Sequence, residues 1–295
     1  MGGVRNSALA LLVVTGILLG LIPPFGKLAS THGVPPLLWA LVISFGAGAV
    51  LLAGLAWRGN RLALDRRHIR YYVIVAIVSY ALPNFLMFAA IPHLGAGYAS
   101  IMFTLSPVIT LLLSFLLRVS RPNPLGVLGV MIGFIGALMV ATTRGQAGHP
   151  ADVIWVVVGL TIPLSLAVGN IYRTIDWPDG SKPLALAAGS HLASAAMLIG
   201  LVLAYEGASS VRVLWDVPLL VAAQIATSSA MFAFFFRLQL VGGPVYLSQI
   251  GYVAAAVGLV IGVVFLDESY ALLTWLGAAI IALGVSITTK ARGTS

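Results

Sequence analysis

Long apolar blocks make up most of the chain, and short polar stretches separate them. A helix needs about 20 mostly apolar residues to cross about 30 Å of hydrocarbon, because each residue adds about 1.5 Å. The gaps HGVPP, RPNP, DWPDG and VGGP carry residues that end helices and form turns. The pattern predicts ten membrane helices, with approximate ranges 7–29, 36–57, 70–91, 95–117, 123–142, 152–173, 183–205, 215–237, 244–266 and 270–289.

Composition supports this interpretation. Of 295 residues, 60% are hydrophobic and only 8% are charged, and the mean hydropathy is +1.06. Soluble domains average about a quarter charged residues, so we expect an all-α integral membrane protein. The first apolar block is longer than the core of a signal peptide and lacks a clear cleavage site, so it is expected to be a retained helix. No gap is long enough for a soluble domain, and the absence of cysteine excludes disulfides and thiolate metal sites.

Basic residues predict the orientation, since Lys and Arg accumulate in cytoplasmic loops. With the N-terminus inside, 13 of the 16 basic residues are cytoplasmic and only Lys27, Arg144 and Arg212 face outward. The cytoplasmic set is Arg5, Arg58, Arg61, Arg66, Arg67, Arg70, Arg118, Arg121, Arg173, Lys182, Arg237, Lys290 and Arg292. The basic stretch RLALDRRHIR is therefore interpreted as an orientation signal rather than a nucleic-acid patch. Both termini are expected in the cytoplasm of a multi-pass inner-membrane protein.

The two halves of the chain resemble each other. LGVMIGFIG at 128–136 and LGAAIIALG at 276–284 match at four of nine positions, and 276 minus 128 gives an offset of 148 residues. Five helices per half is an odd number, so the second copy must insert upside down. We expect two inverted five-helix repeats, 1–146 and 147–295, which is a recurring design of secondary transporters. A duplication without a transport role remains the alternative.

Polar residues within the predicted helices are the candidates for a substrate path, because a polar group in hydrocarbon is costly without a partner. No Asp or Glu falls deep within a predicted helix, and Asp267 and Glu268 follow the ninth one. The candidates are neutral or aromatic: Tyr80, Asn84, Tyr98, Ser100, Asn170, His191, Gln224, Ser228, Tyr246, Gln249 and Tyr252. Such groups suit a neutral or zwitterionic solute with an apolar body, or alternatively bond neighbouring helices.

Several motifs point to structure rather than chemistry. The stretch GLIPPFGKLAS has Leu21 and Leu28 where a phosphate-binding loop needs glycine and a hydroxyl residue, so Lys27 is expected at a helix end. Pro23 and Pro24 mark either a gate or a termination of that helix. The five histidines have no metal-ligand spacing, so neither a metal nor a cofactor is expected. Gly16/Gly20, Gly129/Gly133 and Gly258/Gly262 are expected to let helices pack closely.

Ten helices in two inverted halves, the Gly-Lys at 26–27, PPLLWA at 35–40, LSPVITLLLSFLL at 105–117 and LDES at 266–269 resemble EamA-type members of the drug/metabolite transporter superfamily. Within it, the chain is similar to YddG-type bacterial exporters of aromatic amino acids. The resemblance implies a basket-like fold, with helices 1, 3, 4, 6, 8 and 9 around a central cavity and helices 5 and 10 at the periphery. Many relatives carry an arginine where this chain has Val42 and Ile43, so the role of that arginine does not transfer.

These observations favour a secondary transporter that exports small amphipathic solutes, expected to be aromatic or other hydrophobic amino acids, by alternating access. Without a buried acid, facilitated diffusion is expected, and a cavity without buried Lys or Arg disfavours anionic sugar nucleotides. A proton-coupled multidrug or metabolite carrier is the alternative, with His191 as the group to examine. A polytopic membrane enzyme and a channel are more distant alternatives. The expected partners are a small-molecule substrate and the lipid bilayer, with no nucleic acid and a monomer favoured.

Overall fold

The computed structural model of the chain describes residues 8–119, 123–143 and 151–293, and its secondary structure in these ranges is helical throughout. The α-helices are α2 (Ala8–Thr31), α3 (Pro36–Trp57), α4 (Arg66–Val75), α5 (Leu82–Leu94), α6 (Ala96–Met102), α7 (Ser106–Leu116), α8 (Pro124–Thr142), α9 (Val153–Ile175), α10 (Pro183–Tyr205), α11 (Pro218–Ser248), α12 (Ile250–Phe265) and α13 (Leu272–Gly293). A π-helix, η1 (Ala76–Ala81), and two 3₁₀ segments, η2 (Phe103–Leu105) and η3 (Ala208–Asp216), complete the described secondary structure.

Seven helical segments in the described part of the chain are long and apolar enough to cross a membrane. One of them, Arg66–Leu94, joins α4, η1 and α5, and another, Ala96–Leu116, joins α6, η2 and α7. Three shorter apolar helices cover Pro124–Val140, Ile250–Phe265 and Leu272–Gly284. The expected all-helical class is therefore confirmed for the described residues.

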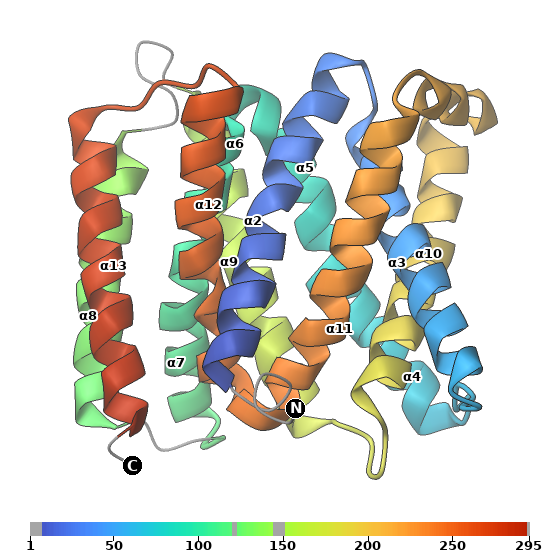
Figure 1. Cartoon of the computed structure of the whole chain (residues 1–295), viewed down its shortest axis with the longest axis horizontal. Coiled ribbons are helices and arrows are strands. Elements are labelled where there is room, and N and C mark those ends of the chain that lie inside the picture. The colour runs from blue at the N-terminus through green and yellow to red at the C-terminus, as the bar shows by residue number, and fades with distance from the viewer. Residues whose placement is uncertain (1–7, 120–122, 144–150, 294–295) are drawn as a thin grey trace.

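The long helical segments run roughly parallel to one another and alternate in direction along the chain, with α4 and α5 in one segment and α6 and α7 in the next (Figure 1). α2 begins and α13 ends at the same end of the molecule (Figure 1). At one edge α8 packs against α13, and at the other α3 packs against α10. Between these pairs, α2 packs against α11 and α12, while α9 packs against α5 and α7. Each half of the chain thus makes its main central contacts with the other half.

Glycines allow the closest of these contacts, as the sequence predicts. A Cβ on Gly16 would lie 2.5 Å from the Val253 side chain, and one on Gly20 would lie 2.8 Å from the Ala254 carbonyl oxygen. α2 therefore approaches α12 at backbone distance. The α8–α13 pair is equally close, because a Cβ on Gly136 would lie 2.5 Å from the carbonyl oxygen of Gly277. The expectation that the GxxxG glycines are packing residues is confirmed.

The third span is interrupted halfway by the π-helix η1. Pro83 follows it, and a proline can neither donate a backbone hydrogen bond nor fit tightly under the carbonyl four residues earlier, which belongs to Ser79. The widened turn relieves this conflict. The Ser165 hydroxyl of α9 donates to the carbonyl of Val78 at 2.7 Å and so satisfies one backbone acceptor of the widened segment.

Two further interruptions lie in the fourth span and near the end of α11. In the fourth span, η2 separates α6 from α7 just before Pro107. Near the end of α11, Gly243 adopts a φ of 71°, and Gln249 then separates α11 from α12. A positive φ favours glycine, and Pro244 removes the next backbone donor. The expected boundary at residue 244 therefore coincides with a kink rather than a helix end.

Three expectations about helix ends need correction. α2 continues through Pro23 and Pro24 to Thr31, because neighbouring helices bury both prolines and hold the helix together. Lys27 consequently lies one turn inside α2. Arg173 and Arg237, expected as the last residues of their helices, lie within α9 and α11, which continue to Ile175 and Ser248. Three other basic residues used to predict the orientation, Arg5, Arg121 and Arg144, lie outside the described residues.

Candidate functional site

A buried pocket lies between the two halves of the chain and encloses about 670 Å³ of empty space, its open mouth included. Both halves supply its walls. The first half contributes Leu19, Ile22, Ser79, Tyr80, Pro83, Asn84, Met87, Phe103 and Ser106. The second half contributes Ile162, Leu166, Asn170, Arg173, Met231, Phe232, Phe235, Leu247, Ser248, Ile250 and Gly251. A mainly apolar wall with a few polar groups is typical of small-molecule sites.

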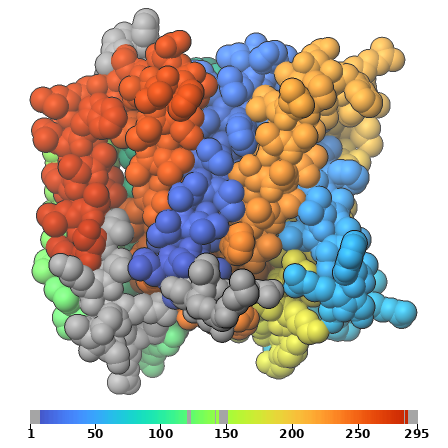
Figure 2. All heavy atoms as spheres, in the orientation of Figure 1, coloured from blue at the N-terminus to red at the C-terminus, as the bar shows by residue number. Residues whose placement is uncertain are grey.

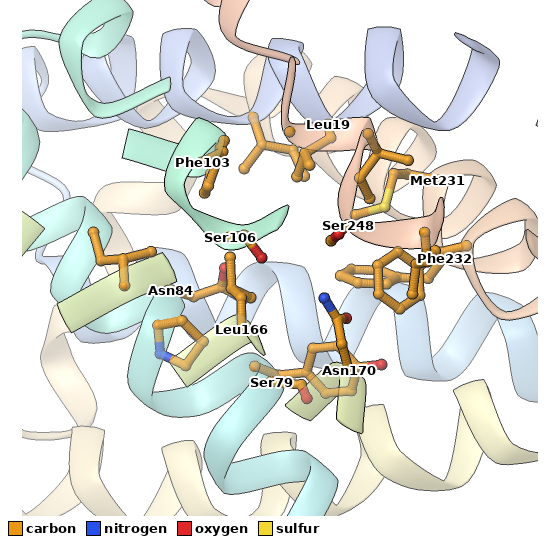
Figure 3. Close-up of a pocket in the computed structure, with 18 of the residues that line it drawn as sticks. Leu19, Ser79, Asn84, Phe103, Ser106, Leu166, Asn170, Met231, Phe232 and Ser248 are labelled. Carbon is orange, nitrogen blue, oxygen red and sulfur yellow. The ribbon is translucent and has the colours of Figure 1, made fainter. Parts of the chain in front are cut away.

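Polar and apolar groups occupy different parts of this wall. Ser106, Ser248 and Asn170 direct polar atoms toward the middle of the pocket, while Leu19 and Phe103 form part of an apolar wall (Figure 3). Each interruption of the helices contributes to the lining: Ser79 comes from η1, Phe103 from η2, and Ser248 from the last residue of α11. Irregular backbone within a membrane is tolerated where it lines a cavity or is buried in protein.

The one cation in the lining is Arg173, whose side chain is fully buried. Its Nη1 donates to the Ser79 hydroxyl, its Nη2 donates to Asn170 Oδ1 at 2.5 Å, and its Nε donates to Gln239 Oε1 at 3.4 Å. The guanidinium carbon also lies 4.8 Å from the ring centroid of Phe235, which is a cation–π distance. Neutral groups alone hold this buried charge among the described residues.

Buried amides connect Arg173 to three helices. Gln239 of α11 donates through Nε2 to the hydroxyl of Thr174 at 2.7 Å and to the Asn170 carbonyl at 3.4 Å. Asn170 Nδ2 in turn donates to the Thr110 hydroxyl of α7 at 3.4 Å. The network fixes the position of the guanidinium, because each of its nitrogens has a positioned acceptor.

Arg173 is a site residue that the sequence pattern does not predict, and the expectation of a cavity without buried Lys or Arg is wrong. Its position at the end of the predicted helix 152–173 indicates an orientation signal and not a site residue. A signal was present, since Asn170 was a candidate and Arg173 follows it by three residues, on the same helix face. Gln239 was missed because the eighth helix was expected to end at 237.

Three of the candidates from the sequence line the pocket: Tyr80, Asn84 and Asn170. The Tyr80 hydroxyl and the Asn84 Nδ2 atom are buried and have no hydrogen-bond partner among the described residues. Unpaired buried polar atoms are rare and costly in folded proteins. Both residues line the pocket, and these two unpaired atoms are buried within its wall.

His191 lies behind the pocket wall rather than in it. Its ring stacks on Tyr80 with centroids 4.0 Å apart, and Phe232 lies 4.0 Å away on centroids. Both ring nitrogens are buried and have no hydrogen-bond partner among the described residues. The hydroxyl of the adjacent Ser190 is also buried and has no partner among them. The contacts of this ring are aromatic, and it forms no hydrogen bond among the described residues. Ser190 and His191 also form no nucleophile–base pair of the kind an enzyme would need.

The remaining candidates lie away from the pocket lining. Gln224 donates to the Ser228 hydroxyl at 2.7 Å within α11, and Ser100 donates to the Ala96 carbonyl at 2.8 Å within α6. Tyr98, Tyr246 and Gln249 are buried elsewhere in the helix contacts. The structure therefore gathers a subset of the predicted residues around one cavity.

Tyr252 borders a second, apolar hollow between α12 and α13. Figure 2 shows a recess between these two helices on the face that it draws. Six of the seven other lining residues are alanine, isoleucine or valine of α12 and α13: Val253, Ala255, Ala256, Ala278, Ile281 and Ala282; Ile101 of α6 is the seventh. The Tyr252 hydroxyl is buried without a partner among the described residues.

A buried carboxylate lies at the other end of α12, in the connection to α13. Glu268 accepts hydrogen bonds from the backbone nitrogens of Ala96 at 2.7 Å and Gly97 at 2.9 Å, and from the Tyr270 hydroxyl. Lys27 Nζ lies 3.9 Å from Glu268 Oε1. Burial and then the charge of Glu268 raise the pKa of Tyr270, so its hydroxyl remains a donor at neutral pH. The expectation that no acid is buried is therefore wrong, although Glu268 caps α6 and is not part of the pocket lining.

In the described ranges, no three His, Asp or Glu side chains cluster as metal ligands would. The pocket wall also offers no group of carboxylates or imidazoles, and its donors are a guanidinium, amides and hydroxyls. This donor set suits the acceptor oxygens of an organic solute.

Similar proteins are found both by sequence and by fold. Residues 6–142 match the EamA-like transporter family. The chain is 26% identical over 267 residues to the uncharacterized inner membrane transporter YedA of Escherichia coli K12. The matched residues make up 88% of this chain and 83% of YedA. YedA of the O6:H1 and O157:H7 strains gives the same values. A crystal structure with 21% identity shares the fold, with a TM-score of 0.69 over 97% of this chain and 99% of the other.

Proposed function

We propose that the chain is a secondary transporter of the EamA type, which moves small amphipathic metabolites across the inner membrane by alternating access. The observation that carries the proposal is the pocket between the two halves. Secondary transporters built from inverted repeats bind their substrates at the repeat interface, near the middle of the membrane. The architecture proposed for it is ten membrane helices in two inverted five-helix repeats, 1–146 and 147–295.

The lining of the pocket supports this repeat. Five pairs of its residues differ in number by 148, the offset between the two LG-containing stretches: 22 and 170, 83 and 231, 84 and 232, 87 and 235, and 103 and 251. A site on the axis between two copies of one fold would be lined by equivalent positions of each copy. Asn84 and Phe232 form one such pair, so the two copies supply different chemistry at an equivalent position.

Helix packing supports the same repeat. Gly136 meets the Gly277 carbonyl, and Gly284 meets the Gly129 carbonyl. Because 129 and 136 become 277 and 284 on adding 148, these two contacts exchange under the repeat. A two-fold axis produces such reciprocal contacts. The family match ends at residue 142, close to the proposed boundary between the copies.

The proposed orientation places the end of the molecule with the α3–α4 and α9–α10 connections in the cytoplasm, together with both termini. Several basic residues lie in these connections and at the start of α4. Ion pairs join α4 to the α9–α10 connection: Arg67 with Asp179 at 2.8 Å and Arg70 with Asp176 at 2.8 Å. Lysine and arginine in short loops favour the cytoplasmic side.

The substrates proposed from the sequence are aromatic or other hydrophobic amino acids. The aromatic lining from Tyr80, Phe103, Phe232 and Phe235 supports an apolar body, and Arg173 supports a carboxylate at one end. Facilitated diffusion is proposed because the only buried acid in the described residues, Glu268, is occupied as a helix cap and does not line the pocket.

The proposal is tested with purified protein in proteoliposomes. Radiolabelled amino acids and their deaminated analogues are screened for saturable flux and for counterflow, which a carrier shows and a channel does not. A pH gradient across the membrane should leave the flux unchanged. Absence of counterflow for every compound would refute the transporter proposal, and flux that requires a proton gradient would favour the proton-coupled alternative.

A further inference from the structure

We infer that the substrate of this pocket is a hydrophobic carboxylate with a net negative charge, such as an aromatic 2-oxo acid, in preference to the zwitterionic amino acid. This inference rests on the proposed transport function, and it replaces the amino acids proposed from the sequence with hydrophobic acids that lack the ammonium group. Four observations lead to it: the donors that Arg173 leaves unused, the absence of an acid around it, the other unpaired groups in the wall, and the aromatic surface beside it.

The guanidinium of Arg173 has hydrogen-bond donors that no described residue accepts from. A guanidinium carries five N–H groups. Three of them donate, one each to Ser79, Asn170 and Gln239. One N–H on each terminal nitrogen is left without an acceptor in the part of the chain that the structure describes. Two N–H groups from the two terminal nitrogens match the spacing of the two oxygens of a carboxylate.

Arg173 also lacks a counter-ion. None of the ion pairs among the described residues includes it, and no Asp or Glu lines the pocket. The nearest acid along the chain, Asp176, pairs with Arg70 and accepts from the Tyr172 hydroxyl. A buried charge without a partner is costly, and a bound anion would relieve that cost.

The other unpaired groups in the wall favour the same ligand. The Asn84 Nδ2 atom is a donor, and the Tyr80 hydroxyl can donate. A carboxylate or 2-oxo group supplies acceptor oxygens only. An ammonium would bring three donors and a second positive charge into a pocket that already holds Arg173. Such a zwitterion would place like charges together in a medium of low dielectric constant.

The aromatic rings define the body of the substrate. The ring centroid of Phe235 lies 4.8 Å from the guanidinium carbon of Arg173. The rings of Phe232 and Tyr80 meet edge to face, with their centroids 5.0 Å apart. An aryl group bound beside these rings would place its carboxylate at Arg173. The loaded pocket would then be electrically neutral, and each transport step would move one negative charge outward.

The test compares three probes of similar size on the wild-type protein: phenylpyruvate, 3-phenylpropanoate and phenylalanine. We expect the two anions to bind at least about tenfold more tightly than phenylalanine, measured by thermal stabilisation and by competition for flux. A potassium gradient with valinomycin sets an inside-negative potential. At about 100 mV, the anions should reach an outside-to-inside ratio of about 50 at equilibrium, while phenylalanine stays near equality.

Two variants complete the test. Arg173→Gln should weaken the binding of phenylpyruvate by about 30-fold or more and abolish the preference for anions. Arg67→Gln removes the same charge outside the pocket and should leave the preference unchanged. If Arg173→Gln does not fold, the ranking and the potential dependence of the wild type decide the question.

The outcomes separate this inference from the transport proposal. Phenylalanine bound as tightly as phenylpyruvate, anion flux indifferent to the potential, or an anion preference that persists in Arg173→Gln would each overturn the inference while leaving a transporter. Absence of flux and counterflow for all three probes and for the twenty amino acids would overturn the transporter itself.

Discussion

The carboxylate of Glu268 lies 2.7 Å from the backbone nitrogen of Ala96, so a residue after α12 caps the start of a helix 172 positions earlier in the chain. Gly97 donates to the second oxygen at 2.9 Å. The first backbone N–H groups of a helix have no partner within the helix, and the helix dipole favours a negative charge there. One side chain thus joins the two halves of the molecule at this end.

Replacing Glu268 with alanine should therefore destabilise the protein by about 1–3 kcal/mol, because two buried N–H groups and the Tyr270 hydroxyl lose their acceptor. Thermal unfolding in detergent measures the effect. Ser269→Ala, at the exposed neighbouring position, is the matched control and should leave the melting temperature unchanged. Equal stability of both variants would contradict the capping role.

Gly136→Ala should separate α8 from α13. The new Cβ would lie 2.5 Å from the Gly277 carbonyl oxygen and 2.9 Å from the Ile281 nitrogen, and backbone atoms of a packed helix cannot yield as a side chain does. Gly54→Ala adds the same methyl group where nothing lies within 4 Å and should be neutral or slightly stabilising. Melting temperatures of the two variants decide the prediction, and a Gly136→Ala protein as stable as Gly54→Ala would refute the close contact.

Asn84→Leu should reduce transport without lowering stability. The buried Nδ2 atom has no partner among the described residues, so its removal costs no hydrogen bond and relieves an unpaired polar group. A solute that binds this amide would lose about tenfold in affinity. Parallel flux and melting measurements test the prediction. A large fall in melting temperature would instead assign Asn84 a structural role.

His191→Phe should keep both the fold and the flux. The imidazole stacks on Tyr80 and contacts Phe232, and neither ring nitrogen has a partner among the described residues. A phenyl ring preserves these aromatic contacts. Flux measured between pH 6 and 8 should have the same pH profile in the variant and the wild type. A profile that flattens in the variant would identify His191 as a proton-binding group.

Asp65 predicts a pH effect on the α3–α4 connection. Its carboxylate accepts from the backbone nitrogens of Arg67 at 3.0 Å and His68 at 3.2 Å and so caps α4. Desolvation opposes ionisation, but hydrogen bonds and the charge of His68 lower the pKa of Asp65 overall. A lowered folded-state pKa adds stability above the pKa of the unfolded chain, and this stability is lost as the pH falls through the folded-state value.

Asp65→Asn, which keeps an N-cap, should therefore lose stability mainly near neutral pH and converge with the wild type in acid. Hydrogen exchange of the first turn of α4, followed from pH 7 to pH 3, measures the difference. A gap between the two proteins that stays constant over this range would show that the ionisation of Asp65 contributes nothing.

The sequence predicted what depends on local pattern. Apolar block length located the helices, and the spacing of Gly16 and Gly20 predicted a close helix contact, because a missing Cβ has the same consequence wherever a helix meets a neighbour. Pocket membership could not be predicted in the same way. Arg173 and Arg58 are both basic residues at the ends of apolar blocks, and only the three-dimensional arrangement of η1, α9 and α11 buries the first.

The capping role of Glu268 could not be predicted either, since nothing in the sequence around Glu268 indicates a partner at Ala96. The widened turn at η1 was foreshadowed by Pro83, but proline alone does not tell whether a helix ends, bends or widens. Long-range partners decide these cases, and they are set by packing rather than by the neighbouring residues in the sequence.

The cross-packing of α2 and α9 has a mechanical consequence. α2 lies against α11 and α12 of the second half, and α9 lies against α5 and α7 of the first. If either half of the chain tilted relative to the other, it would have to move together with a helix that belongs to the other half. Cutting the chain between α8 and α9 would give two fragments, and the central helices of each would lack a packing partner that the other fragment supplies.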